Sequence, residues 1–140
     1  MFSPARTTDL ATSSLACGKN PPRAQRYRNL FLATGLVGSE ILSIPPSGKG
    51  RSHVFNYYII RVQRRGELRR FLATHGIQTE VYYPLPLHLQ PCFAQLGYVK
   101  GDFPRAELAA SEVLALPMYP ELTGEQQELV VEKISDCCLK

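Results

Sequence analysis

The segment at residues 76–90, GIQTEVYYPLPLHLQ, constrains the fold of this chain more than any other stretch. Its first residues alternate between apolar and polar side chains, which is the pattern of a buried strand. Pro84 and Pro86 then remove backbone hydrogen-bond donors and push the residues before them toward extended geometry. We therefore expect a stiff, extended loop leaving the end of a strand, which is a common place for binding sites. The loop carries three side chains suited to binding: Tyr82, Tyr83 and His88.

The length of the chain, 140 residues, is that of one domain with its own apolar core. No apolar run approaches the roughly 20 residues that cross a bilayer, so the sequence predicts no membrane-spanning helix. Arg6 is followed by no continuous apolar stretch, which argues against a secretory signal. The cysteines form no C-x-x-C pair, and we expect free thiols in a reducing compartment. They are Cys17, Cys92, Cys137 and Cys138.

The net charge of +4 is divided unevenly along the chain. Residues 1–75 contain twelve Lys and Arg against three Asp and Glu, a net charge of +9, whereas residues 76–140 contain four against nine, a net charge of −5. A basic half is one feature of nucleic-acid-binding proteins. Four of its arginines fall on the expected outer face of a helix, however, which favours a solvated helix surface. They are Arg64, Arg65, Arg69 and Arg70.

Residues 1–20 are rich in Ser, Thr and Ala and show neither a helical nor a strand period. Such a segment buries too little apolar surface to offset its ordering entropy, so we expect it to be disordered or unrelated to the rest. An organelle transit peptide shares this composition, although the segment is short for one. The folded domain is accordingly predicted at residues 21–140.

The domain opens with a predicted helix at residues 23–34. Tyr27, Leu30 and Phe31 fall on one face of it, and Gly35 is suited to end it.

Alternating patterns follow in the middle of the chain. A short apolar piece at residues 41–44 precedes a Pro- and Gly-rich loop at 45–50. Residues 54–62, VFNYYIIRV, are dense in aromatic and β-branched side chains and predict the strongest strand. A helix at residues 67–75 and a second strand at 77–81 come next. This order fits either a compact parallel crossover or an antiparallel α+β layer. The helix should turn three residues inward: Leu68, Phe71 and Leu72.

The last third of the chain is predicted to be mainly helical. Residues 88–96 form a short helical turn and residues 106–114 a helix, followed by an extended edge or loop at 116–120. Thr123 and Gln126 have the spacing of a capping box, which opens a final helix ending near residue 136. We expect its apolar face to contain Leu129, Val130, the stem of Lys133, and Ile134.

The usual catalytic motifs are missing from the sequence. It has no Gly-rich phosphate loop, no H-E-x-x-H and no G-x-S-x-G. His53, His75 and His88 are scattered, and each alone reads as an ordinary histidine, with His75 at a helix C-terminus. The paired tyrosines are individually more typical of a core or of cross-strand contacts, except Tyr83, whose direction Pro84 fixes. From these patterns alone we predict an α+β domain with a rigid aromatic loop.

The sequence nevertheless resembles a known family over residues 23–134. The resemblance is carried by RAQRYRNLF, HVFNYYIIRV and the long run from GIQTEVYYPLPLHLQ to LVVEKI. Within that run, Y-P-x-P-x-H-x-Q, L-G-Y, G-D-F-P-x-A-E and L-x-L-P-x-Y-P-E-L-T occur in order. These motifs resemble the C-terminal domain of the DegT/DnrJ/StrS family of pyridoxal-phosphate-dependent sugar aminotransferases.

The resemblance implies a fold and a cofactor. It implies the small α+β domain of the aspartate-aminotransferase fold, fold type I, with a short antiparallel sheet packed against helices. The large domain of that fold, which carries pyridoxal 5′-phosphate and the Schiff-base lysine, has no counterpart in this sequence. None of the five lysines matches the family's lysine motif, so we expect no covalently bound cofactor and no transamination by this chain alone. They are Lys19, Lys49, Lys100, Lys133 and Lys140.

The resemblance also implies which residues border the sugar-nucleotide cleft. The start of the strongest strand and the proline loop are the two contributing regions. They would hold substrate by hydrogen bonds and stacking rather than by proton transfer, and the resemblance implies no catalytic and no metal-ligating residue. The implied substrate-binding residues are His53, Asn56, Tyr82, Tyr83, His88 and Gln90.

The function implied by the resemblance is that of the C-terminal part of an enzyme that transfers an amino group, typically from glutamate, to a keto-sugar nucleotide. It further implies a cytoplasmic homodimer acting in polysaccharide or amino-sugar biosynthesis. The chain could be a truncated gene product or the product of a start assigned downstream of the true one. The alternative is a non-catalytic interaction module that binds nucleic acid through the basic half, although no RNP-like aromatic array supports it. A third possibility is a domain that exposes an apolar patch and self-associates.

Overall fold

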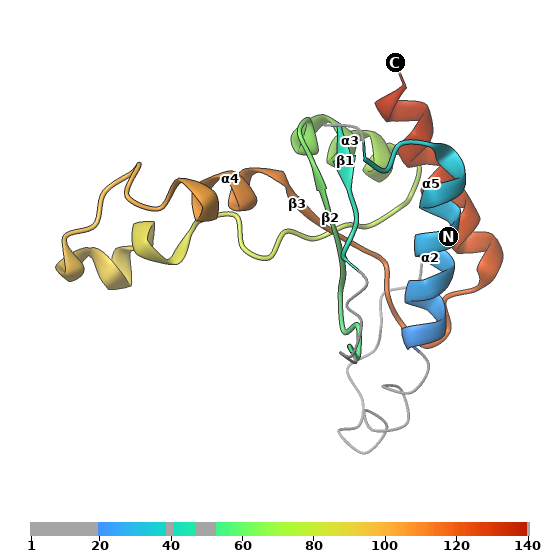
Figure 1. Ribbon diagram of the computed structural model, residues 1–140, viewed down its shortest axis with the longest axis horizontal. Coiled ribbons are helices and arrows are strands. Elements are labelled where there is room, and N and C mark those ends of the chain that lie inside the picture. Colours follow the sequence, from blue (N-terminus) through green and yellow to red (C-terminus); the bar gives the residue numbers. More distant parts are fainter. Residues whose placement is uncertain (1–19, 39–40, 47–52, 140) are drawn as a thin grey trace.

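The computed structural model describes residues 20–38, 41–46 and 53–139. It shows a compact body of sheet and helices from which one long arm projects to the left (Figure 1). Residues 1–19 of the segment predicted to be disordered, and most of the predicted loop at 45–50, lie outside the described residues, whereas Asn20 begins helix α2. The helices and strands, in chain order, are α2 (Asn20–Thr34), β1 (Leu42–Ser43), β2 (Tyr58–Val62), α3 (Arg65–Thr74), η1 (Leu87–Leu89), η2 (Pro91–Leu96), α4 (Pro104–Glu112), β3 (Val113–Leu116) and α5 (Gly124–Cys138).

The sheet has the strand order β1-β2-β3, and both pairs are antiparallel. Leu42 pairs with Val62 on one side of β2, and Tyr58 pairs with Leu116 on the other. The predicted α+β class with a short antiparallel sheet is therefore confirmed, and the parallel crossover is wrong. None of the helices in the described ranges is long and apolar enough to cross a membrane.

The core lies between the sheet and helices α2, α3 and α5, which cover one of its faces (Figure 1). Tyr27 and Phe31 of α2 are fully buried, as predicted, and pack on Tyr58 of β2 with ring centroids 5.1 and 6.4 Å apart. Burying a side chain of this size stabilises the fold by about 1.5–3 kcal/mol. Gly35 ends α2 with φ of 71°, which confirms it as the helix stop.

Strand β2 is shorter than predicted, because residues 54–57 do not pair. Phe55 has φ of 51°, a left-handed conformation that interrupts an extended chain. Its N–H donates to Nδ1 of His53 at 2.8 Å, so a local side-chain bond replaces a ladder bond. Residues 53–57 therefore form a turn that enters β2.

The predicted strand at residues 77–81 is wrong except for one bridge. Only Glu80 pairs, with Ala115 of β3, through bonds of 2.8 and 3.2 Å. The predicted alternation is nevertheless present, since Ile77 and Thr79 are buried and their neighbours are exposed. The chain leaves the sheet edge after this bridge because Pro84 and Pro86 follow and cannot donate to a ladder.

Strand β3 replaces the end of a predicted helix. Helix α4 stops at Glu112, and Val113 and Leu114 extend to pair with Arg61 and Ile60 of β2. The β-branched side chain of Val113 and the pairing partner available on β2 outweigh the helical period. Of the extended edge or loop predicted at 116–120, only Leu116 belongs to β3, and the chain continues from Pro117 as a loop.

The final helix begins at the predicted capping box. Thr123 Oγ1 accepts from the N–H of Gln126 at 3.2 Å, and Gln126 Oε1 accepts from the N–H of Thr123 at 2.9 Å. Val130 and Ile134 are buried as predicted, but Leu129 is 39% exposed. The prediction that Leu129 lies on the apolar face is therefore wrong. Each residue advances a helix by 100°, so Leu129 is turned away from the buried face, which contains Gln127 and Val131 instead.

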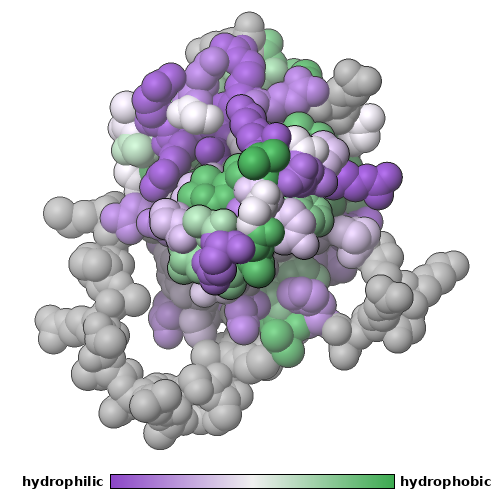
Figure 2. Space-filling view, turned by 90° about the vertical axis from the view of Figure 1, so that its left-hand side faces the viewer, coloured by the Kyte–Doolittle hydropathy of each residue, from purple (hydrophilic) through white to green (hydrophobic). Residues whose placement is uncertain are grey.

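The arm contains η1, η2 and α4 and has no core of its own (Figure 1). The predicted helical turn at residues 88–96 is confirmed as η1 and η2, ended by Gly97 in the left-handed conformation. Figure 2 views the arm end-on and shows hydrophobic side chains gathered at its centre among polar ones. The exposed apolar side chains of the arm include Leu87, Leu96, Tyr98, Val99, Phe103 and Leu108.

Candidate functional site

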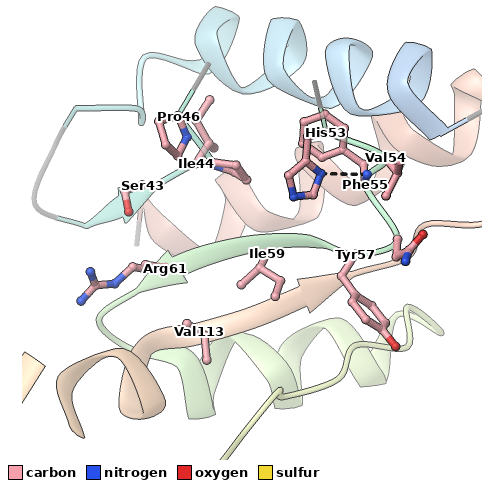
Figure 3. Close-up of a pocket in the computed structure, with 12 residues that line it drawn as sticks. Ser43, Ile44, Pro46, His53, Val54, Phe55, Tyr57, Ile59, Arg61 and Val113 are labelled. Carbon is pink, nitrogen blue, oxygen red and sulfur yellow. Dashed lines mark hydrogen bonds between the residues drawn. The ribbon is translucent and has the colours of Figure 1, made fainter. Parts of the chain in front are cut away.

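A cleft of about 720 Å³ lies beside the outward-facing side of β2 (Figure 3). Tyr58, Ile60 and Val62 point into the core, so the alternate side chains of the strand face outward. One wall of the cleft is therefore formed by the sheet, and the other by residues 53–57, which precede β2. Its lining residues include Ser43, Pro46, His53, Asn56, Tyr57 and Arg61.

His53 stands at the entrance to β2 and is oriented by its neighbour. Its Nδ1 accepts the N–H of Phe55, and the two rings are 4.3 Å apart (Figure 3). Because Nδ1 acts as the acceptor, the neutral imidazole carries its proton on Nε2. His53 is therefore a hydrogen-bond donor at the wall of the cleft.

Asn56 and Tyr57 extend the cleft toward the proline loop. Both also line a second, smaller cavity of about 190 Å³, which reaches Tyr82 and Glu80. Tyr57 and Tyr82 pack ring to ring with centroids 4.6 Å apart and an interplanar angle of 45°. Partial burial and the nearby Tyr57 raise the pKa of Tyr82, so its hydroxyl stays protonated at neutral pH. Tyr83 contacts Tyr82 edge-on at 6.1 Å.

His88 and Gln90 lie on the arm and not in this cleft. His88 lines an apolar hollow of about 450 Å³ with Phe93, Tyr98 and Phe103. Gln90 forms a hydrogen bond within the arm, where its Nε2 donates to Leu85 O at 3.4 Å. The residues predicted for the substrate site thus form two groups. His53, Asn56 and Tyr82 line the two cavities and make up the cleft group together with Tyr83, which contacts Tyr82 but lines neither cavity. His88 and Gln90 make up the arm group.

Tyr57 and Arg61 were not predicted as site residues. Tyr57, like the other paired tyrosines, was expected in a core or cross-strand role, yet it is 52% exposed and its ring is tilted against that of Tyr82. Arg61 faces outward from β2 and forms a two-pronged bond with Glu112 Oε2, from Nε at 3.0 Å and from Nη2 at 2.7 Å. The period of two that starts from buried Tyr58 was the signal that could have identified both.

Several described arginines of the basic half contact other residues of the protein. Arg26 pairs with Glu128, Arg64 with Glu67 and Arg69 with Glu80, in addition to the Arg61 pair. Arg65 is half-buried and donates to the carbonyl of Ala110. These contacts occur on several elements, as expected for a solvated and paired surface, and they form no single basic groove.

The described residues do not fit a complete site for a covalently held pyridoxal cofactor. Such a site needs a lysine at the cleft, and neither lysine of the described part, Lys100 or Lys133, is among the lining residues of the two cavities. Lys133 bonds to Glu132 at 2.8 Å and Asp136 at 3.1 Å, which raises its pKa and opposes its use as a neutral amine. The described ranges also contain no cluster of three metal-ligating side chains.

Known proteins of one family are similar to this chain in sequence and in fold. The sequence model of the DegT/DnrJ/EryC1/StrS aminotransferase family matches residues 16–135. A pleiotropic regulatory protein of Geobacillus stearothermophilus is 57% identical over 97 residues, which are 69% of this chain and 26% of that protein. The dTDP-3-amino-3,4,6-trideoxy-alpha-D-glucose transaminase of Streptomyces venezuelae is 35% identical over 74% of this chain and 27% of its own length.

Solved structures agree with the sequence comparison. The crystal structure of S. venezuelae DesV in complex with a ketimine intermediate matches with a TM-score of 0.81 and 31% identity, over 94% of this chain and 34% of that one. NtdA from Bacillus subtilis with bound cofactor PMP matches with a TM-score of 0.77 and 30% identity, over 91% of this chain and 29% of that one. The chain spans about a quarter to a third of the length of these relatives. It belongs to the DegT/DnrJ/EryC1/StrS aminotransferase family.

Proposed function

We propose that this chain is the small C-terminal domain of a pyridoxal-phosphate-dependent aminotransferase that acts on a keto-sugar nucleotide. In this proposal the cleft beside β2 and the aromatic loop form part of the wall that holds the sugar nucleotide. The observation that supports this proposal is the ring contact between Tyr57 and Tyr82, which joins the cleft to the aromatic loop. The two thereby form one continuous surface from His53 to Tyr83.

The chemistry of this surface suits a sugar nucleotide. Tyrosine rings offer flat apolar faces for a base or a sugar ring. The Nε2–H of His53, the amide of Asn56 and the hydroxyl of Tyr82 offer donors and acceptors for sugar hydroxyls. Among relatives of this chain, one is named for a dTDP-linked amino sugar and another for UDP-N-acetyl-3-dehydro-alpha-D-glucosamine. These names support the substrate class, with glutamate as the expected amino donor.

We propose further that the 140-residue chain does not transaminate by itself. The cleft lacks a lysine among the described residues, and Lys133 is held as a cation by two carboxylates. The activity, the homodimer and the cytoplasmic location therefore belong, in this proposal, to a protein that also contains a cofactor-binding domain. In the chain itself, the role of the site is to bind and orient substrate.

The experiment that tests the binding role is a titration of the ¹⁵N-labelled chain followed by NMR. The probes are dTDP-glucose and UDP-N-acetylglucosamine at up to millimolar concentration. We expect saturable amide shifts confined to residues 53–57 and 80–83. Asn56→Ala should weaken binding about three- to tenfold, the usual worth of a lost hydrogen bond. Asn29→Ala, an asparagine exposed on α2, is the matched control and should leave binding unchanged.

Either of two results would overturn this proposal. One is the absence of saturable shifts with both probes, and the other is shifts that cluster away from the cleft. Inactivity is tested separately by adding pyridoxal phosphate, reducing with borohydride and locating adducts by mass spectrometry. A stoichiometric adduct on one lysine would show that the chain holds the cofactor by itself.

A further inference from the structure

The pair formed by His88 and Glu107 is the most shielded ion pair in the described part of the chain. Nε2 of His88 lies 3.1 Å from Oε1 of Glu107, and the two side chains are only 9% and 17% exposed. Every other ion pair of the described residues has at least one partner above 40%. The contact joins η1 to the first turn of α4, across nineteen positions of sequence.

Glu107 is held in place by a second bond. The same oxygen, Oε1, accepts the N–H of Gly101 at 2.7 Å, so one carboxylate oxygen ties the histidine to the turn before α4. The hydrogen bond from the Gly101 N–H, and to a smaller extent the one from His88, lowers the pKa of Glu107. The side chain is therefore a carboxylate at neutral pH. A carboxylate can only accept hydrogen bonds, so Nε2 of His88 must be the donor.

The imidazole of His88 is also fixed by packing. Its ring lies 4.8 Å from the ring of Phe103, which in turn meets Tyr98 edge-on at 5.0 Å. Among the described residues, Glu107 is the charged group that lies within hydrogen-bond distance of His88. Two constraints, one polar and one aromatic, thus set the position of the ring on the arm.

We propose that Glu107 is the positioning residue for His88. It holds the imidazole proton on Nε2, which leaves Nδ1 as the acceptor that His88 can offer to a hydroxyl or an amide of a bound substrate. It also fixes where the ring stands relative to the proline loop. The part of this inference that concerns substrate rests on the proposed function, whereas the tautomer and the orientation do not.

The experiment reads the two ring nitrogens of His88 in the ligand-free, ¹⁵N-labelled 140-residue chain. Long-range proton–nitrogen spectra distinguish a protonated from an unprotonated nitrogen. Above the titration range of histidine we expect His88 to be a single tautomer, with Nε2 protonated and Nδ1 unprotonated. Glu107→Gln keeps the shape but replaces the carboxylate by an amide that can also donate. The variant should therefore show a mixture of tautomers, and its Gly101 amide should exchange with solvent about tenfold faster.

Glu112→Gln is the matched control for this measurement. Glu112 ends the same helix, is similarly shielded and binds the Arg61 guanidinium. This variant should leave both readouts unchanged, and Glu107→Asp, which retains the carboxylate, should restore part of the single tautomer. A fixed Nε2–H tautomer in Glu107→Gln, or a mixture in the unchanged chain, would overturn the proposal. Because no sugar nucleotide is present, failure of the proposed function would leave these results intact.

Discussion

The contact between Tyr57 and Tyr82 is the best place to test the geometry of the candidate site. Tyr57 lies just before β2 and Tyr82 just after the Glu80–Ala115 bridge, so their rings join two segments that are distant in the sequence. We predict that Tyr57→Leu and Tyr82→Leu are coupled in their effects on stability. Leucine retains apolar bulk but removes the aromatic face on which the contact depends.

The expected magnitude follows from the geometry and exposure of the pair. Aromatic pairs at this separation contribute about 0.5–1.5 kcal/mol beyond the area that they bury. Tyr57 is 52% exposed and Tyr82 is 37% exposed, which places the pair in the lower half of that range. The double-mutant cycle should give an interaction free energy of about 0.5–1 kcal/mol.

Urea unfolding of the four proteins of the cycle measures this quantity directly. The matched control cycle pairs Tyr57 with Tyr83 instead of Tyr82. Tyr83 is more exposed than Tyr82, and its ring contacts Tyr82 rather than Tyr57. Tyr57→Leu and Tyr83→Leu should be additive. An interaction free energy for Tyr57 and Tyr82 no larger than that of the control cycle would refute the reasoning, because the rings would then not be in contact in solution.

Three further outcomes are expected. Thr123→Ala removes the cap of α5 and should lower the free energy of unfolding by about 1 kcal/mol, or Tm by about 3–5 °C, in calorimetry; an unchanged Tm would contradict the capping box. Because its folded pKa lies below the ordinary value of 4.5, Glu107 contributes stability that is present above pH 4.5 and is lost as the pH falls through the lowered value. Acid unfolding should therefore be less steep in Glu107→Gln, and parallel curves would contradict this. The exposed apolar arm should cause concentration-dependent self-association, which Leu87→Ser with Val99→Ser should reduce in analytical ultracentrifugation; a monomer at all concentrations would show the patch to be inert.

Local signals predicted most helices of the body correctly. The face of α2 and the capping box of α5 depend on residues three or four positions apart, so sequence alone contains the information. The sheet was harder to predict because it depends on partners that are distant in the chain. Val113 reads as helical by its neighbours, and only the pairing with Arg61 shows that it is extended.

The sequence proposed residues for the candidate site but did not indicate how they would be grouped. The resemblance named six positions, yet neither motif nor spacing indicated that His88 and Gln90 would stand on an arm apart from the cleft. The arm arises because Glu80 makes a single bridge and the prolines that follow prevent a second. Tyr57 was not predicted as a site residue because a tyrosine in a strong strand is usually a core residue.

The position of the arm relative to the cleft is set at its base. Three contacts attach it there: Glu80 pairs with Ala115, Arg61 of β2 binds Glu112 at the end of α4, and Arg65 of α3 donates to the carbonyl of Ala110 in α4. The arm has no buried core, and segments with few buried contacts open at low free-energy cost. If the cleft group and the arm group touch one substrate, these contacts at the base of the arm must fix the distance between the two groups. Arg61 is therefore placed to link the wall of the cleft to the element that positions His88, because a single side chain lines the former and binds the helix that contains Glu107.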